Sequence, residues 1–436
     1  MLTRVLRSLP PASLRSSQRL WAAVESKRAT VSAAICAYLV FMTVAPIATT
    51  PRRSDDKINQ IVPHLIAQHE SAGHSAIESF FWQIHSMYAP WMHDMGRFFP
   101  GSAAWTVTVM TAFQTRLSYK VFLAALSALM ILIVVRYARE IVGAQVLPVA
   151  VVALSSCITL RYWFDPLDGF SGVVPLTILL TFAVLLILLR GSGWFSLMIG
   201  AFLWTCALVT YEVVVTMTPV VCIVLYFKRR SWRPVAAVLL PTLAISGYVE
   251  WLRSRVTHMQ GDAYQVRLNP HDVVATYLKQ TLGVLPLAEQ WLHKTAVIHV
   301  SGTLVAEMIV IVGLPAFVLL TLSARTFDDP SEVHSRWLVL TGLGAWLCPP
   351  VLVAISKGWQ ENLPTGEAYV SALWGYVGFA LLLAAAWHWI VRRTLRHAGP
   401  AGTVVVVAVN VVLAALAGFT VAQSFQIAQM TQAGIW

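Results

Sequence analysis

Charged residues are scarce in this chain. Aspartate, glutamate, lysine and arginine together make up 12% of its 436 residues, whereas a soluble domain carries about a quarter. Hydrophobic residues make up 57%, and the chain has 17 tryptophans. A surface of this composition would not stay dispersed in water, so the composition excludes a soluble or disordered chain and predicts a membrane protein.

Cysteines are also few. There are 5 of them, all within apolar blocks and none with CxxC spacing, at positions 36, 157, 206, 222 and 348. This placement argues against an extracellular disulfide framework and against a cysteine-based zinc site. We expect the cysteines to be small packing residues.

The motifs of several protein classes are missing. The sequence contains no P-loop, no GxSxG and no HExxH, so it gives no support for ATP-driven transport, serine hydrolysis or zinc proteolysis. The formal net charge is +11, but no basic stripe is interleaved with aromatic residues, so no nucleic-acid partner is expected.

What the sequence does contain is a series of apolar blocks of roughly 17 to 22 residues, the length that crosses a hydrocarbon core about 30 Å thick as a helix. Only "TYE" at 210–212 divides the 194–227 region. The predicted fold is all-α, a polytopic transmembrane helix bundle of about eleven spans. The blocks are 31–48, 118–137, 146–163, 172–190, 194–210, 212–227, 234–252, 303–322, 337–356, 369–390 and 403–423.

Positive charge predicts the orientation. Residues 1–30 are basic and lack the apolar region and cleavage site of a signal peptide, so we expect a cytoplasmic tail followed by one transmembrane domain, 31–436. With the N-terminus inside, every short inner loop carries lysine or arginine, as the positive-inside rule requires, and the excess charge contacts anionic lipid headgroups. The sequence thus predicts a multi-pass protein of the cell membrane, either an inner or a plasma membrane. The inner charges are Arg136, Arg139, Arg190, 228–233, Arg325, Arg336 and 392–397.

The same parity places three long loops outside, at 49–117, 253–302 and 357–368. Long loops on a rigid scaffold commonly carry function, so we expect the site on the external or periplasmic face.

The first outer loop holds five of the 12 histidines. Those at 64, 69 and 74 are five apart, about 140° around a helix, and so do not share a face as metal ligands would. No metal or other cofactor is predicted, although a divalent ion stays an alternative. Apolar residues at 58, 61, 62, 65 and 66 indicate an amphipathic surface helix that Pro63 either starts or breaks.

The stretch "PWMHDMGRFFP" (90–100) ends this polar part of the loop. In one interpretation Asp94 pairs with Arg97 or caps a turn beside Gly96. In the other, its aromatic and apolar flanks place the carboxylate at the bilayer edge, where desolvation makes an idle charge costly and a catalytic one effective.

These residues, together with "RYWFDPLDGF" (161–170), "LVTYEVVVTMTPVV" (208–221) and "YVSALWGYVGFALLL" (369–383), resemble bacterial membrane glycosyltransferases of the GT-C superfamily. The D-x-G-R-F-x-P stretch is the strongest element, and the resemblance spans most of the chain. It implies a GT-C-like architecture with a large first outer loop, and transfer of a sugar from a polyprenyl-phosphate donor to a glycan or glycolipid of the cell envelope. Many members also end in an outer soluble domain, whereas the last apolar block of this sequence, 403–423, lies close to Trp436. We therefore expect either a compact member or one whose loops make all acceptor contacts.

The resemblance implies that Asp94 is the general base of an inverting hexosyl- or pentosyltransferase without a glycosyl-enzyme intermediate. The departing phosphate needs fixed cations, and the candidates near the outer face are Arg97, Arg161, Arg253 and Arg267. A tight polar turn explains Asp165 and Asp168 as well as ligand binding does, and snorkelling explains Glu212 as well as a functional role. The further site candidates are His93, Glu70, Asp165, Tyr211 and Glu212.

Two other functions fit the same composition. A transporter or flippase of lipid-linked sugars would also be polytopic and aromatic-rich, but transporters tend to carry repeated halves and polar residues near the bilayer midplane, and the sequence has neither feature. A polysaccharide polymerase or ligase would share the donor and the topology.

Overall fold

The computed structural model describes residues 27–161, 165–191, 193–256, 265–292, 300–325, 335–397 and 399–434. Most of the predicted tail, 1–30, therefore lies outside the described residues. Within these ranges the chain is helical and forms no strand; one isolated backbone bridge joins Val266 and Ser356. The all-α prediction is confirmed.

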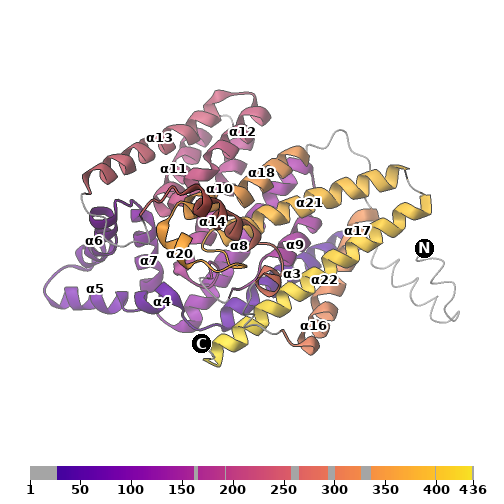
Figure 1. Cartoon of the computed structure of the whole chain (residues 1–436), viewed down its shortest axis with the longest axis horizontal. Helices are drawn as coiled ribbons and strands as arrows, with labels where there is room; N and C mark the ends of the chain where they lie inside the picture. Colours follow the sequence, from indigo (N-terminus) through magenta and orange to yellow (C-terminus); the bar gives the residue numbers. More distant parts are fainter. Residues whose placement is uncertain are drawn as a thin grey trace.

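The helices follow the chain in one bundle (Figure 1). In the first half they are α3 (Arg28–Thr49), α4 (Ser54–Asn59), α5 (Val62–Ser71), α6 (Ala76–Met95), α7 (Pro100–Ala112), α8 (Arg116–Val142), α9 (Val146–Cys157), η1 (Phe170–Gly172), α10 (Val173–Arg190) and α11 (Trp194–Thr210). In the second half they are η2 (Glu212–Met217), α12 (Thr218–Arg229), α13 (Trp232–Arg255), α14 (Pro270–Leu282), α15 (Ala288–Trp291), α16 (Gly302–Met308), η4 (Ile309–Gly313), α17 (Leu314–Arg325), α18 (Ser335–Leu347), α19 (Pro350–Ala354), α20 (Lys357–Asn362), α21 (Ala372–His397) and α22 (Gly399–Gln432).

Eight helices in the described ranges are long and apolar enough to span a bilayer, and two shorter apolar helices, α9 and α11, accompany them. The chain is thus a multi-pass membrane protein. Each of the eleven predicted blocks contains a helix, but α12 is only 12 residues long after the 3-10 turn η2. The span count of eleven stays a prediction.

The loops gather at two ends of the bundle, as the alternating topology requires. At one end, Arg116 and Gln432 donate to the carbonyl of Thr49, and Arg161 donates to the carbonyl of Gly283, so loops expected outside contact one another. At the other end, the loops expected inside meet, where Arg28 donates to Leu322 and Arg229 donates to Leu189. We call the first end the outer end; which side of the membrane it faces is a prediction from charge.

Helix α9 is too short to cross the membrane alone, and the non-helical backbone that follows it leads to the site. Its 12 residues rise about 18 Å, and the chain continues as buried non-helical backbone at 158–161. Irregular backbone at such depth is tolerated where protein surrounds it. Helices α3, α8, α21 and α22 pack around α9 and provide that cover.

Glycines bring α18 and α21 into close contact. A Cβ on Gly378 would lie 2.4 Å from the amide nitrogen of Trp346, and one on Gly342 would lie 2.8 Å from the carbonyl oxygen of Gly378. Small residues at helix interfaces let backbones approach in membranes, where no hydrophobic effect drives helices together. This pair fixes the helix that carries Tyr376 to the site.

The first outer loop folds into the two short helices α4 and α5, the longer helix α6, and α7, which lie at the left of Figure 1. Pro63 occupies the first turn of α5, so it starts the helix and does not break it, and Val62 and Ile66 are buried beneath it. Ser75 caps α6 by accepting from the amide of Glu78, and Gly96 ends it with a left-handed φ of 59°.

Candidate functional site

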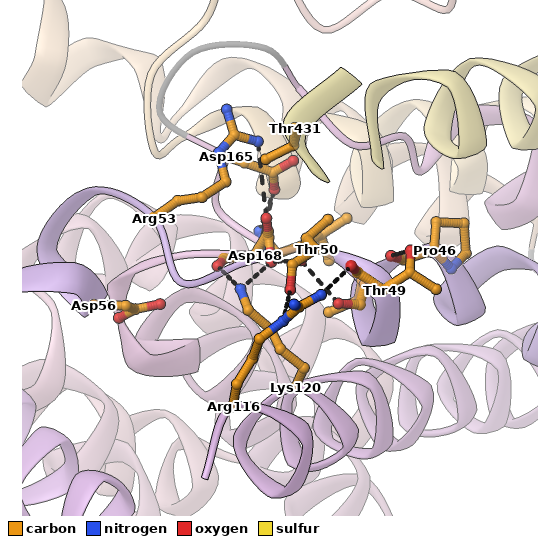
Figure 2. A network of polar contacts seen from close by, with 12 residues as sticks. Pro46, Thr49, Thr50, Arg53, Asp56, Arg116, Lys120, Asp165, Asp168 and Thr431 are labelled. Atoms are coloured by element: carbon orange, nitrogen blue, oxygen red, sulfur yellow. Dashed lines mark hydrogen bonds and ion pairs between the residues drawn. The ribbon is translucent and has the colours of Figure 1, made fainter. Parts of the chain in front are cut away.

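Three carboxylates are buried together at the outer end. Asp56 is on α4, while Asp165 and Asp168 lie in the segment between α9 and η1. Two cations accompany them: Lys120, which is 0% exposed, on the second turn of α8, and Arg53 before α4. We call these five residues the acid cluster (Figure 2).

Asp168 is the centre of the acid cluster. Its Oδ1 is ion-paired with Lys120 and accepts from the Thr50 hydroxyl at 2.5 Å, and its Oδ2 lies 3.8 Å from Nη1 of Arg53. The Lys120 ammonium also donates to the backbone carbonyl of Asp168 at 2.9 Å. A lysine inside an apolar helix is tolerated because this carboxylate pairs with it.

Asp165 organises the turn that contains it. Its Oδ2 accepts from the amide of Arg161 at 2.5 Å, and its Oδ1 accepts from the amides of Leu167 at 2.7 Å and Asp168 at 3.1 Å. The tight polar turn that is one of the two explanations of Asp165 and Asp168 is therefore present. Burial and the neighbouring Asp168 charge raise the pKa of Asp165, despite the three amide donors.

Asp56 has one satisfied oxygen and one unsatisfied oxygen. Its Oδ1 accepts from the amide of Ser171 at 2.7 Å and from the Ser171 hydroxyl at 3.1 Å. Its Oδ2 is buried and makes no hydrogen bond of good geometry within the described part of the chain, although the Tyr119 hydroxyl, likewise without a partner there, faces the same carboxyl. Burial raises the pKa of Asp56 to about 6, although Tyr119, Lys120 and the Ser171 amide favour the ionised form. Such a group combines a pKa near working pH with a free oxygen, as a general base needs.

The acid cluster holds three carboxyl groups against two cations. Burial disfavours the unmatched negative charge, which agrees with the raised pKa of Asp56 and of Asp165. Perturbed, buried carboxyls of this kind concentrate at functional sites.

Arg161 lies beside the acid cluster and is 1% exposed. Its guanidinium donates to the carbonyl of Gly283 at 2.9 Å and to the hydroxyl of Tyr376 at 2.8 Å, and it lies 3.5 Å from Glu289. These contacts tie together α21 and the segment 283–289. Arg161 thus supports the outer end from within: its two terminal guanidinium nitrogens contact protein groups, while its Nε has no hydrogen-bond partner among the described residues.

A second polar group lies at the C-terminus of α6. Arg97 forms an ion pair with Glu212 at 2.6 Å, and its guanidinium lies 4.7 Å from the ring centroid of Phe99 and 5.4 Å from that of Trp91. Arg253, on the last turn of α13, donates to the carbonyl of Gly96 at 3.3 Å. We call Arg97, Glu212 and Arg253 the arginine site. It brings together three of the residues predicted from the sequence.

Asp94 is half-buried on the last turn of α6. Its carboxylate makes no hydrogen bond or ion pair with any residue of the described ranges, and Arg97 is instead paired with Glu212. The interpretation of Asp94 as the salt-bridge partner of Arg97 is therefore wrong. Its role as a base stays a prediction.

The other predicted site residues are dispersed. His93 is exposed on α6, Glu70 is exposed on α5, and Tyr211 directly precedes Glu212. Arg267 lies in the loop before α14 and forms exposed ion pairs with Asp272 at 3.2 Å and Glu361 at 3.1 Å.

Helix α7 connects the arginine site to the acid cluster. Near its start, a Cβ on Gly101 would lie 2.8 Å from the hydroxyl of Thr210, which is two residues before Glu212. Four residues later, which is about 6 Å along a helix axis, Trp105 donates to the carbonyl of Ser171 at 2.8 Å. Ser171 in turn holds Asp56, so the two polar groups are neighbours across one helix.

Two of the five histidines of the first outer loop, His69 and His74, stack on each other. His69 lies between His74 and Trp82, with ring centroids 3.9 Å and 4.3 Å away. In the described ranges no three histidine, cysteine or acidic side chains are placed to hold a metal ion. All five cysteines are free, and Cys36 and Cys157 are buried among apolar residues.

Sequence reasoning missed Asp56, Lys120 and Ser171 as site residues. Lys120 gave a signal, since an ionisable residue within an apolar block is a functional candidate by default. Asp56 follows the first span in "SDDK", close to the membrane boundary. Ser171 gave no signal, because its importance comes from its backbone conformation and its long-range contacts.

The fold and the site define a polytopic helical membrane protein with buried titratable groups at one end. No protein-family model matches the chain, and no curated protein matches it. Among solved structures, the chain is similar to the crystal structure of ArnT from Cupriavidus metallidurans bound to undecaprenyl phosphate. The two are 12% identical, with a TM-score of 0.40 over 92% of this chain and 77% of that one. That score is too low to support a functional inference, which therefore depends on the residues themselves.

Proposed function

We propose that the chain is a membrane glycosyltransferase that moves a sugar from a polyprenyl-phosphate donor to a hydroxyl of a cell-envelope glycan or glycolipid. The observation that carries the proposal is Asp56: a buried carboxyl with a pKa near 6 and one free oxygen, beside buried cations at the outer end of an apolar bundle. The resemblance of "HDMGRFFP" and of the later stretches to GT-C enzymes supports the donor class.

The chemistry requires one base and one cationic site. The acceptor oxygen attacks the anomeric carbon, the bond from that carbon to the phosphate oxygen breaks, and the acceptor proton passes to a carboxylate. The polyprenyl phosphate leaves with the bonding electron pair. A positioned base contributes about 10²–10⁴-fold in rate, and fixed cations stabilise the charge that develops on the phosphate. A single displacement of this kind inverts the configuration.

Two carboxylates compete for the role of base. Asp94 is the residue that the sequence resemblance implies, and its half-buried carboxylate is free to accept a proton. Asp56 has the stronger chemical case, because Ser171 orients it and its raised pKa matches the work of a base near neutral pH. We therefore rank Asp56 before Asp94 as the general base.

The arginine site is the proposed contact for the donor phosphate. Arg97 presents a guanidinium against aromatic rings at the end of a loop that we expect at the membrane surface, where a lipid phosphate would arrive. Arg253 lies next to it. Arg161 is a weaker candidate because its side chain is 1% exposed, and Arg267 is weaker because two carboxylates, Asp272 and Glu361, already pair with it, whereas Arg97 pairs with one.

The proposed setting is a cell membrane with the N-terminus in the cytoplasm and the outer end facing outward. A flippase and a polymerase or ligase remain the alternatives. A flippase would move the lipid without breaking the sugar–phosphate bond, and a polymerase or ligase would transfer a longer glycan.

The test uses the purified protein in nanodiscs with synthetic polyprenyl-phosphate sugars and envelope lipids as acceptors, and mass spectrometry of the lipid products. The expected result is release of polyprenyl phosphate from the donor, with a gain of mass on the acceptor that matches the transferred sugar. Release of no polyprenyl phosphate, together with movement of labelled donor across proteoliposomes, would replace the proposal with the flippase.

Paired variants then separate the two bases. Asp56→Asn and Asp94→Asn each remove basicity but keep shape, and loss of the true base should lower transfer at least about 10²-fold while donor binding persists. Glu140→Gln is the matched control, because Glu140 pairs with Arg190 at the opposite end of the bundle.

A further inference from the structure

Three consecutive residues of η1 have left-handed backbone. The φ angles are 56° at Phe170, 52° at Ser171 and 73° at Gly172. Glycine adopts this region freely, but phenylalanine and serine rarely do. Strained conformations of this kind persist only where the surroundings over-determine them, and they cluster at functional sites.

The contacts around η1 account for its conformation. A Cβ on Gly172 would lie 2.8 Å from the end of Leu126 and 2.9 Å from the end of Leu123, and the positive φ of Gly172 favours glycine there. Trp105 donates to the carbonyl of Ser171 at 2.8 Å, which fixes the peptide from one side. On the other side, both the amide and the hydroxyl of Ser171 point at one oxygen of Asp56.

We infer that Ser171 is the positioning residue of the reaction: its left-handed backbone aims two donors at Oδ1 of Asp56 and so leaves Oδ2 for the proton of the acceptor. This inference rests on the proposed function. An ordinary extended or helical conformation at Ser171 would turn the amide away from the carboxylate. The strained backbone of Ser171 therefore determines which oxygen of Asp56 accepts hydrogen bonds.

Several charged or titratable groups face Asp56 besides Ser171. Tyr119 and Lys120 of α8 favour the ionised carboxylate, and Asp168 disfavours it. Removing the serine hydroxyl takes away a donor that favours the ionised form, so the pKa of Asp56 should rise. The acid side of the rate profile should move to higher pH.

The experiment compares Ser171→Ala with the wild type over a pH series of transfer rates. We expect the acid limb to move upward by about 1 pH unit, because one hydrogen bond to a charged group corresponds to roughly that shift. We also expect kcat on the plateau to fall about 10-fold with an unchanged donor KM, as for a group that acts on orientation. Ser171→Gly also removes the hydroxyl but relieves the backbone strain, so it gives the same upward shift in a protein that folds more readily.

Ser323→Ala is the matched control, since Ser323 is a buried serine whose hydroxyl donates to Leu319 in α17. It should leave the profile in place. If neither the acid limb of the pH profile nor the plateau kcat changes in the two Ser171 variants, the positioning role is overturned.

A second measurement does not need turnover. Infrared titration of the purified protein, corrected by subtracting the Asp56→Asn variant, follows protonation of Asp56 directly. The midpoint should be higher in Ser171→Ala than in the wild type, even if no sugar donor reacts. An inactive wild type would thus defeat the proposed function, whereas an unchanged midpoint would defeat the role of Ser171.

Discussion

The ion pair between Lys120 and Asp168 permits a quantitative test of the acid cluster. Both side chains are 0% exposed. The variant Lys120→Met leaves Asp168 with the Thr50 hydroxyl and with Arg53 at 3.8 Å. Breaking a buried pair by removing one partner costs about 3–5 kcal/mol, because the remaining charge stays buried without its closest counter-charge.

The double variant should cost much less than the sum of the single variants. Asp168→Asn alone leaves a buried ammonium with the carbonyl oxygen of residue 168 as an acceptor. Combined with Lys120→Met, it leaves two neutral side chains of similar volume, and such replacements are often nearly neutral. We expect a coupling free energy of about 2 kcal/mol or more from the cycle.

The assay is reversible unfolding of the purified protein in mixed detergent micelles, followed by tryptophan fluorescence. The control cycle uses Glu140 and Arg190, a pair whose side chains are 33% and 44% exposed. Exposed pairs contribute about 0–1 kcal/mol. Additive costs at Lys120 and Asp168, as at the control pair, would refute the buried ion pair.

Three further predictions follow from the site, the packing and the topology. If Asp56 is the base, transfer should fall about tenfold per pH unit below its pKa of about 6, because the protonated carboxyl cannot accept the proton; a profile flat down to pH 5 would exclude it. Gly378→Val should disrupt the contact with Trp346 and destabilise the bundle by about 3 kcal/mol or more, measured in the same micelles, whereas Gly193→Ala, with nothing within 4 Å of its Cβ, should not. In a chain freed of native cysteines, Ser71→Cys should react with an impermeant reagent in intact cells and Arg393→Cys should not, and the reverse pattern would invert the predicted orientation.

The spans could be predicted because hydropathy is a local property. The blocks 118–137 and 403–423, for example, lie within α8 and α22, since each residue's transfer free energy depends little on its partners. The residues at which the helices end were harder to predict. Block 146–163 continues beyond Cys157, where α9 stops, because the next residues are apolar but buried as irregular backbone.

The site was predicted only in part, for a different reason. Arg97, Glu212 and Arg253 each stood out as ionisable residues near the outer face, but their pairing could not be predicted. Asp94 is three residues from Arg97, yet the partner of Arg97 is Glu212, which α11 brings into place. The contact of Asp56 with Ser171 joins residues 115 apart in the sequence. Tertiary contacts of this range leave no periodicity in a single sequence.

The arrangement of the two polar groups bears on which carboxylate can serve as the base. An inverting displacement requires the acceptor to attack from the side opposite the departing phosphate. If the arginine site holds that phosphate, a base three residues from Arg97 at the end of α6 lies on the leaving-group side. Asp56 is separated from the arginine site by α7, through Gly101 at one end and Trp105 with Ser171 at the other. A sugar placed across the first turns of α7 would then have a cation on one face and a free carboxylate oxygen on the other. The raised pKa of Asp56 fits that role as well, because burial brings the pKa of this carboxyl to about 6, where its ionised form can take up the proton of a neutral hydroxyl near neutral pH.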